Sequence, residues 1–197
     1  MKKNIVVFDI ETKDSFSDVG GRDLFEKLSI SVVGIYDYGT DEFVVYEEKE
    51  FKKLADRLSR KPLLVGFNSR RFDTPILQKY IPFDLKKLPQ LDILEEISKA
   101  LGHRVALDSI ARATLGSGKS GSGLEAIKLW REGRMEELKR YCLDDVRITR
   151  DIFEYGAENG ELFYVPKFGA GRARAEIGWK VEHPTETTSD AAQQALF

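Results

Sequence analysis

The sequence predicts an α/β domain in which helices cover a mixed β-sheet. Three observations support this class. Strand-like runs come first, further runs then alternate with amphipathic segments, and the length of 197 residues suits one medium domain. With 42% hydrophobic and 32% charged residues, the chain can form a core without disulfides. We therefore expect one folded domain and not a disordered chain.

The first half of the chain supplies most of the expected strands. Strands are expected at 5–8, 29–38, 42–46 and 63–67, and helices at 47–60 and from 74 to 80. The strand segments are rich in β-branched and aromatic residues, and the Gly-Thr-Asp turn at 39–41 makes the second and third a hairpin. The helix at 47–60 has apolar residues three and four apart, and Pro62 follows its end. Pro75 suits the first turn of the next helix.

The second half of the chain is predicted to be mainly helical. A short strand is expected near 88–91, followed by helices at 92–101, 107–115, 124–131 and 135–155. Residues 116–123 consist only of Gly, Ser and Lys, and we expect a flexible loop there. The pattern weakens after Pro166, and residues 183–197 are polar and turn-rich. The chain therefore divides into a domain at 1–165 and a C-terminal extension and tail at 166–197.

Composition and charge exclude several classes of function. The 31 Lys and Arg residues against 33 Asp and Glu give a net charge of −2, which excludes a strongly basic protein that wraps nucleic acid. Cys142 is the one cysteine and there are two histidines, so a metal site would have to be built from carboxylates. No apolar run approaches the roughly 20 residues of a membrane span, and the start lacks a long apolar signal region. We expect a cytoplasmic protein without membrane contact.

Acidic residues stand in three places where the expected elements end or turn. Asp9 and Glu11 lie two apart at the end of the first strand, so both point to one face. Asp73 closes an Asn-x-x-x-Phe-Asp turn, and Asp145 follows Tyr141 by four residues on one face of the last helix. Each place has an ordinary alternative: a solvated strand edge, a helix cap at Asp73, and a core tyrosine beside a surface acid.

Taken together, the three segments resemble the exonuclease motifs of the DEDD superfamily of 3′-to-5′ exonucleases. Phe-Asp-Ile-Glu-Thr, Asn-x-x-x-Phe-Asp and Tyr-x-x-x-Asp occur in this order, and the resemblance covers roughly residues 4–165. The chain looks most similar to the exonuclease domains of family B DNA polymerases and to YprB-like domains, the latter through residues 107–111 and 119–121. The resemblance implies a ribonuclease H-like fold with a mixed five-stranded sheet flanked by helices.

The resemblance also implies the subtype and the roles of the motif residues. The histidine of the His subtype would stand five residues before Asp145, where this chain has Arg140, so Tyr141 indicates the tyrosine subtype. The four acids would hold two Mg²⁺ or Mn²⁺ ions and the tyrosine would orient the attacking water. Four convergent carboxylates repel one another unless cations neutralise them, and oxygen ligands suit these ions. The catalytic residues implied are Asp9, Glu11, Asp73, Tyr141 and Asp145.

Residues beside the motifs are expected to contact nucleic acid. They are Thr12, Asn68, Arg70, Arg71, Phe72 and Lys119. The basic residues of this set, with Arg140, would contact the phosphates. Such local cations are needed because the chain as a whole has a net charge of −2. Phe16 and Phe25 are candidates for stacking on terminal bases, and core packing is an equal alternative. The expected partner is a single-stranded 3′ end, with DNA favoured over RNA.

Two other functions compete with this hypothesis. Residues 113–120 fit a relaxed form of the phosphate-binding loop of NTPases, with Ala113 in place of the first glycine. Such a loop must follow a strand, whereas residues 107–115 are expected to be helical. The second alternative is a non-catalytic ribonuclease H-like domain that binds nucleic acid or acts as a scaffold, and the complete set of acids with the tyrosine argues against it.

The C-terminal sequence suggests a protein partner. Gln-Gln-Ala-Leu-Phe at 193–197 resembles the Gln-x-x-Leu-Phe form of bacterial sliding-clamp-binding peptides. The resemblance implies clamp binding through Gln193, Leu196 and Phe197, with Gln194 standing where leucine is usual. A plain tail is the alternative. Clamp binding would strengthen the case for DNA as the substrate.

Overall fold

A five-stranded mixed sheet forms the centre of the protein. The computed structural model describes residues 4–118, 123–167 and 171–179. In spatial order the strands are β3 (Glu42–Glu47), β2 (Ile30–Asp37), β1 (Ile5–Thr12), β4 (Leu63–Gly66) and β5 (Gln90–Asp92). The β1–β2 and β2–β3 pairs are antiparallel, and the β1–β4 and β4–β5 pairs are parallel. The predicted mixed five-stranded sheet is confirmed.

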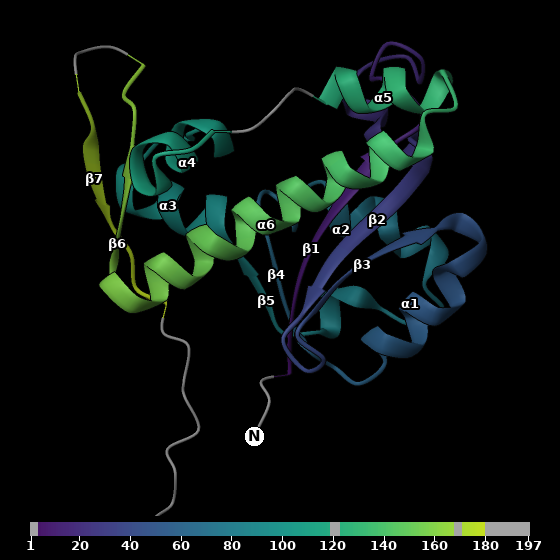
Figure 1. The fold of residues 1–197 in the computed structure, drawn as a ribbon, viewed down its shortest axis with the longest axis horizontal. Coiled ribbons are helices and arrows are strands. Elements are labelled where there is room, and N and C mark those ends of the chain that lie inside the picture. Colours follow the sequence, from purple (N-terminus) through teal and green to yellow (C-terminus); the bar gives the residue numbers. More distant parts are fainter. Residues whose placement is uncertain (1–3, 119–122, 168–170, 180–197) are drawn as a thin grey trace, which may run out of the picture.

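Helices cover both faces of this sheet (Figure 1). The α-helices are α1 (Phe51–Leu58), α2 (Asp73–Leu77), α3 (Ile93–Leu101), α4 (Leu107–Leu115), α5 (Gly123–Arg131) and α6 (Met135–Asn159). Short 3₁₀ turns occur at η1 (Arg22–Lys27), η2 (Glu48–Glu50), η3 (Gln78–Tyr80) and η4 (Leu85–Lys87). The long helix α6 crosses in front of the sheet in the view of Figure 1. Within the described ranges, no helix has the length and apolar character needed to cross a bilayer.

The alternation of side chains along β1 divides the core into two layers. Val6, Phe8 and Ile10 pack on the face that α1 and α2 cover. Ile5 and Val7 point the other way, into the cluster formed with α3, α4 and α6. Successive side chains of a strand point to opposite faces, so Asp9 and Glu11 lie on the side of Val7. The strand expected at 5–8 thus continues to Thr12, and Glu11 within it pairs with Val32 of β2.

A glycine on β2 lets α6 approach the sheet closely. Gly34 lies opposite Asp9 in the β1–β2 pair. A Cβ atom at Gly34 would lie 2.8 Å from Cys142 Sγ and 3.0 Å from Val146 Cγ2, both on α6. Any larger side chain would push the helix away from the strand. The absence of a side chain at Gly34 therefore sets the distance between α6 and the acids of β1.

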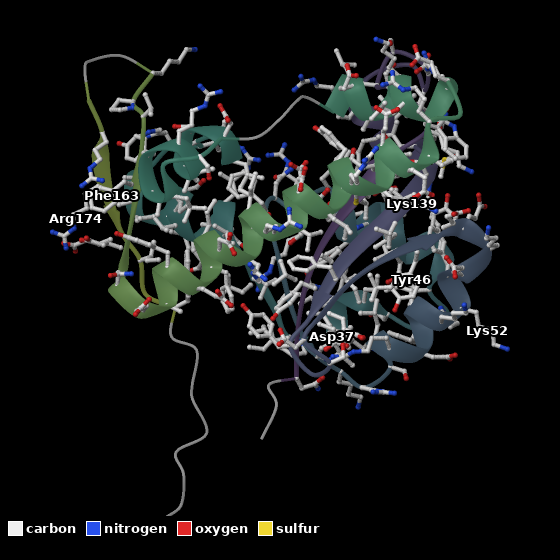
Figure 2. All side chains as sticks on the ribbon, in the orientation of Figure 1. Asp37, Tyr46, Lys52, Lys139, Phe163 and Arg174 are labelled. Atoms are coloured by element: carbon white, nitrogen blue, oxygen red, sulfur yellow. The ribbon has the colours of Figure 1, made fainter. Side chains whose placement is uncertain are left out.

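The chain after α6 forms a second sheet that the sequence pattern did not predict. Strand β6 (Glu161–Tyr164) pairs antiparallel with β7 (Ala173–Glu176), and Phe163 lies opposite Arg174 (Figure 2). On its other edge β6 meets hydroxyl groups of α4. Thr114 Oγ1 donates to the Phe163 carbonyl at 2.8 Å and accepts from the Phe163 N–H at 2.9 Å, and Ser109 bonds Val165 in the same way. The α4 hydroxyls thus satisfy backbone groups that would otherwise form a free strand edge.

Trp179 anchors the end of the described chain to α6. Its indole Nε1 donates to the Phe153 carbonyl at 3.2 Å, and the side chain is buried. Its ring lies against Gly156, where a side chain would collide with it. Residues 171–179 of the expected extension therefore pack against the domain, and the boundary at 165 stays a prediction.

We expect Gly34→Ala to destabilise the protein. The added methyl group overlaps Cys142 and Val146, and overpacking of this kind lowers the free energy of unfolding by about 1–3 kcal/mol. Urea unfolding measures the effect. Gly178→Ala is the matched control, because a Cβ there meets no atom within 4 Å. Equal stability of Gly34→Ala and the wild type would show that α6 does not need this close contact.

Candidate active-site cleft

All four predicted acids line one cleft at the carboxyl-terminal ends of the parallel strands β1 and β4. The cleft has a volume of about 660 Å³. Asp9 and Glu11 come from β1, Asp73 is the first residue of α2, and Asp145 comes from the middle of α6. Three segments that lie far apart in the sequence thus bring their carboxylates to the same hollow.

A hydrogen bond joins the second motif to the first. The backbone N–H of Ile10 donates to Asp73 Oδ1 at 3.3 Å, and the bond is buried. Because Ile10 stands between Asp9 and Glu11, this contact fixes Asp73 beside the acids of β1. Phe72 occupies the N-cap position of α2. The alternative in which Asp73 caps this helix is therefore wrong, since Asp73 is already its first helical residue.

The third motif reaches β1 through Cys142. The thiol donates to the Asp9 carbonyl, with 3.8 Å between Sγ and the oxygen. Asp145, on the same helix, is 2% exposed. Tyr141 is also buried, but its ring belongs to the apolar cluster with Val32 and Leu138 and is not among the residues that line the cleft. The structure thus brings the four acids together and places the ring of Tyr141 in the neighbouring core.

The donor atoms of the cleft suit a hard divalent cation. Oxygens of Asp9 and Glu11 and the sulfur of Cys142 lie within 4.8 Å of one another. Burial, followed by the negative charges of Asp9, Glu11 and Asp145, raises the pKa of the Cys142 thiol well above its usual range. Mg²⁺ and Mn²⁺ prefer oxygen to sulfur ligands, so the carboxylates are the donors that suit these ions. The residues present fit these ions.

The lining of the cleft is strongly acidic. It contains five acids, the four above and Asp14, against the two cations Arg22 and Arg104. If all are ionised, the lining carries a net charge of −3. A phosphate would be repelled from such a surface unless cations were bound in it.

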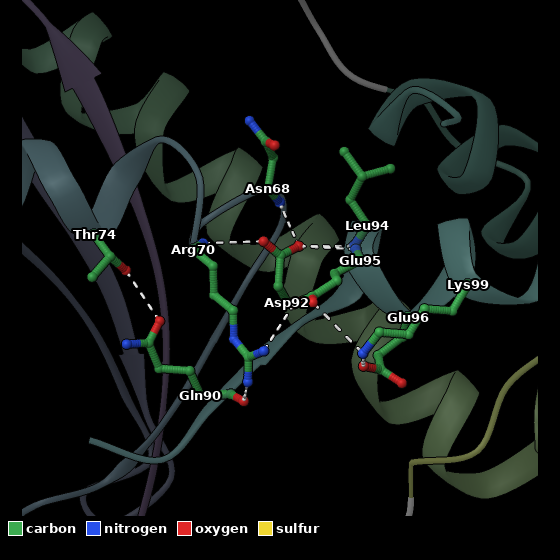
Figure 3. A network of polar contacts seen from close by, with 9 residues as sticks. All are labelled: Asn68, Arg70, Thr74, Gln90, Asp92, Leu94, Glu95, Glu96 and Lys99. Atoms are coloured by element: carbon green, nitrogen blue, oxygen red, sulfur yellow. Dashed lines mark hydrogen bonds and ion pairs between the residues drawn. The ribbon is translucent and has the colours of Figure 1, made fainter. Parts of the chain in front are cut away.

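Some of the predicted nucleic-acid contacts lie in the cleft and others do not. Thr12, Asn68 and Phe72 belong to the lining. Arg70 does not, because its guanidinium donates to Glu95 at 2.9 Å and to the Gln90 carbonyl at 2.6 Å (Figure 3). Outside the lining there are also two exposed arginines, Arg71 and Arg140. Outside the described residues are Lys119 and the predicted clamp-binding residues Gln193, Leu196 and Phe197.

Aromatic residues form one wall of the cleft. Phe16 and Phe72 both line it, and their rings pack edge to face with centroids 5.9 Å apart. Phe25 stacks on Phe72 from another side, at 6.0 Å, and does not line the cleft. Of the two phenylalanines considered for stacking on bases, Phe16 therefore faces the cleft and Phe25 supports Phe72 from behind.

Sequence reasoning missed several residues of the lining. Arg104 and Val105 lie in the connection between α3 and α4, Leu124 is 70% exposed at the start of α5, and Arg22 begins η1. None stands beside a motif in the sequence. A glycine such as the left-handed Gly102 at the end of α3 indicates that a helix stops. It does not indicate that the residues after it return to the cleft.

A buried carboxylate fixes the turn that carries Asn68. Asp92 is 3% exposed, and its Oδ1 accepts the N–H of Asn68 at 2.8 Å while its Oδ2 accepts the N–H of Arg70 at 3.0 Å (Figure 3). Oδ1 also caps α3 by accepting the N–H groups of Leu94 and Glu95. One side chain therefore ties the turn after β4 to the start of α3.

The context of an NTPase phosphate-binding loop is missing. Residues 113–115 are the last residues of helix α4, and the left-handed Gly116 caps it, so the segment follows a helix and not a strand. The helix expected at 107–115 is confirmed with the same bounds. The NTPase alternative thus loses the strand that its loop requires.

Comparison with known proteins identifies the family. A family model of the RNase H superfamily matches residues 6–156. The chain belongs to the RNase H superfamily. The match spans the sheet and all three acidic motifs, and it confirms the ribonuclease H-like fold. This RNase H superfamily domain is also 28% identical over 153 residues to a DNA-directed DNA polymerase of Escherichia phage T7. The match covers 72% of the chain and 21% of the polymerase, so the chain spans about a fifth of that relative's length.

We expect Asp92→Ala to destabilise the domain by about 2–4 kcal/mol. The substitution leaves four backbone N–H groups without their acceptor, two in the turn after β4 and two at the start of α3. Chemical unfolding measures the loss. Glu96→Ala, which removes an acid of α3 that pairs with Lys99, is the control and should change stability by less than about 0.5 kcal/mol. A similar small change for Asp92→Ala would contradict the assigned role.

Proposed function

We propose that this RNase H superfamily domain is a metal-dependent 3′-to-5′ exonuclease of the DEDD type that hydrolyses phosphodiester bonds of nucleic acid. The observation that supports it most is the convergence of four carboxylates from three separate motifs on one cleft. A domain that only bound nucleic acid would have no need of this arrangement, because clustered acids repel phosphates. The acidic lining is explained when the cleft works with bound divalent cations.

The four carboxylates are proposed to hold two Mg²⁺ or Mn²⁺ ions. When bound, the ions supply an activated water and neutralise charge on the phosphate and the leaving oxygen. Oxygens of Asp9 and Glu11 lie within 4.8 Å of each other and of the Cys142 sulfur, and the negative charge of Asp145 acts on the same thiol. Asp73 is held beside β1 by the hydrogen bond from the Ile10 N–H. The protein thus prepares the ligands before any ion binds, through backbone contacts of β1.

Tyr141 is proposed to orient the attacking water, which defines the tyrosine subtype. It precedes Asp145 by one turn of α6. A phenol with a pKa near 10 is a poor base at neutral pH, so orientation and not proton removal is the assigned task. Because the ring lies in the core next to the cleft, the role requires its hydroxyl to reach the water, and substitution tests this directly.

DNA is the proposed substrate class. The relative from phage T7 is a DNA-directed DNA polymerase, and the similarity covers 72% of this chain. An aromatic wall with Phe16 and Phe72 offers surfaces on which unpaired bases stack, and such contacts contribute about 1–3 kcal/mol per base. The proposal therefore names a single-stranded 3′ end of DNA.

We expect Asp9→Asn and Asp145→Asn to abolish hydrolysis at unchanged fold. Loss of a carboxylate ligand should lower the rate by at least about 10³-fold, which corresponds to about 4 kcal/mol of barrier. Tyr141→Phe should lower the rate by about tenfold to a hundredfold and leave metal binding intact. Time courses on end-labelled single strands in Mg²⁺ or Mn²⁺ measure these rates. Asp56→Asn, an exposed acid of α1 outside the cleft, is the matched control.

The direction of hydrolysis and the substrate need their own experiment. End-labelled DNA and RNA strands with free and blocked 3′ ends should give a ladder from the free 3′ end, and DNA should be cut faster than RNA. Hydrolysis that starts at the 5′ end, or that persists in excess chelator, would contradict the proposed function.

A further inference from the structure

Arg104 and Asn68 form a polar pair in the cleft that the proposed chemistry does not use. Arg104 Nη2 donates to Asn68 Oδ1 at 2.6 Å, and both residues line the cleft. Arg104 comes from the connection between α3 and α4, and Asn68 from the turn after β4. Two loops from different parts of the chain therefore place a guanidinium in the same hollow as the four acids.

The turn holds Asn68 in a fixed position. Its backbone has a φ of 63°, in the left-handed region, and its N–H donates to the buried Asp92. Asparagine tolerates this conformation better than most residues with a side chain. With its backbone fixed, the amide of Asn68 can orient Arg104, whose long side chain would otherwise lose conformational entropy on binding a ligand.

The guanidinium of Arg104 has donors available for an anionic ligand. Among the described residues it forms no ion pair, whereas Arg70 pairs with Glu95 and Arg112 with Asp108. The other cation of the lining, Arg22, lies over the ring of Phe16, 5.3 Å from its centroid. A guanidinium has five N–H donors in a planar fork, and the bond to Asn68 leaves others to face a phosphate.

We propose that Arg104, held by Asn68, binds a backbone phosphate of the nucleic-acid strand that occupies the cleft. The inference rests on the proposed function and extends it, because the residue acts on substrate binding and not on the bond that breaks. Arg104 then provides the phosphate contact that Arg70 cannot make from its position outside the cleft. Its removal should affect KM and leave kcat nearly unchanged.

The test compares binding and hydrolysis in a small set of variants. Fluorescence anisotropy measures the Kd of a labelled single-stranded oligodeoxynucleotide over a series of salt concentrations, with Ca²⁺ in place of Mg²⁺. Arg104→Ala should raise Kd about tenfold and lower the slope of log Kd against log salt by about 0.7, the value for one contact to a single strand. Arg104→Lys should restore the slope and only part of the affinity, because lysine keeps the charge but not the fork.

Two further variants separate this contact from general effects. Asn68→Gly keeps the left-handed turn and removes the amide, so it should weaken binding by less than Arg104→Ala does. The double variant Asn68→Gly/Arg104→Ala should have a Kd within about twofold of that of Arg104→Ala alone, because the two residues act as a unit. Arg60→Ala, an exposed arginine outside the cleft, removes the same charge and should leave Kd and the salt slope unchanged.

The outcomes distinguish this inference from the proposed function. If the Arg104→Ala protein folds and keeps the wild-type Kd, salt slope and KM, the inference is overturned. The nuclease proposal still stands in that case, provided that the wild type hydrolyses the strand. An equal effect of Arg60→Ala would also overturn it. Binding that depends on Arg104, in a protein that hydrolyses no strand, would support the inference and refute the nuclease proposal.

Discussion

Helix α6 can bring Asp145 to Asp9 because β2 has a glycine at position 34. The helix packs directly on the backbone of the strand, and Cys142 lies against both Gly34 and the Asp9 carbonyl. A methyl group at this point would already be too large. The distance between the first and third motifs, and with it any metal site shared between them, depends on this contact.

The second constraint is electrostatic. A cleft with a net lining charge of −3 repels a polyanion, yet the fold holds its acids close together. The Ile10 N–H binds the Asp73 carboxylate, and the Cys142 thiol joins α6 to the Asp9 carbonyl. Two divalent cations, as proposed above, would resolve this conflict, because they would make the lining weakly positive. The overall charge of −2 for the whole chain is therefore compatible with nucleic acid as a partner. The acids that repel phosphate in the free protein are the residues that would bind its counter-ions.

The loops that carry Asn68 and Arg104 into the cleft depend on the buried carboxylate of Asp92. Asp92 ties the turn after β4 to the start of α3, and the connection after α3 carries Arg104 back to Asn68. Asp92 thus links the stability of the domain to the phosphate contact proposed for Arg104. The same turn sends the guanidinium of Arg70 outward to Glu95, which explains why neighbours of a motif in sequence need not be its neighbours in space.

Local geometry allowed the sequence to predict much of the fold, and the resemblance to DEDD exonucleases pointed to the four acids that the structure brings to one cleft. Side chains two apart on a strand point to the same face, so Asp9 and Glu11 share one face of β1. Residues four apart lie on the same side of a helix, so Tyr141 and Asp145 share one side of α6. Both relations follow from the backbone geometry alone. Tertiary structure decided the rest. The pairing of β6 with β7, the presence of Arg104 in the cleft and the position of the Tyr141 ring in the core depend on where connections lead the chain and on which side chains fill the space between layers. No local period contains that information.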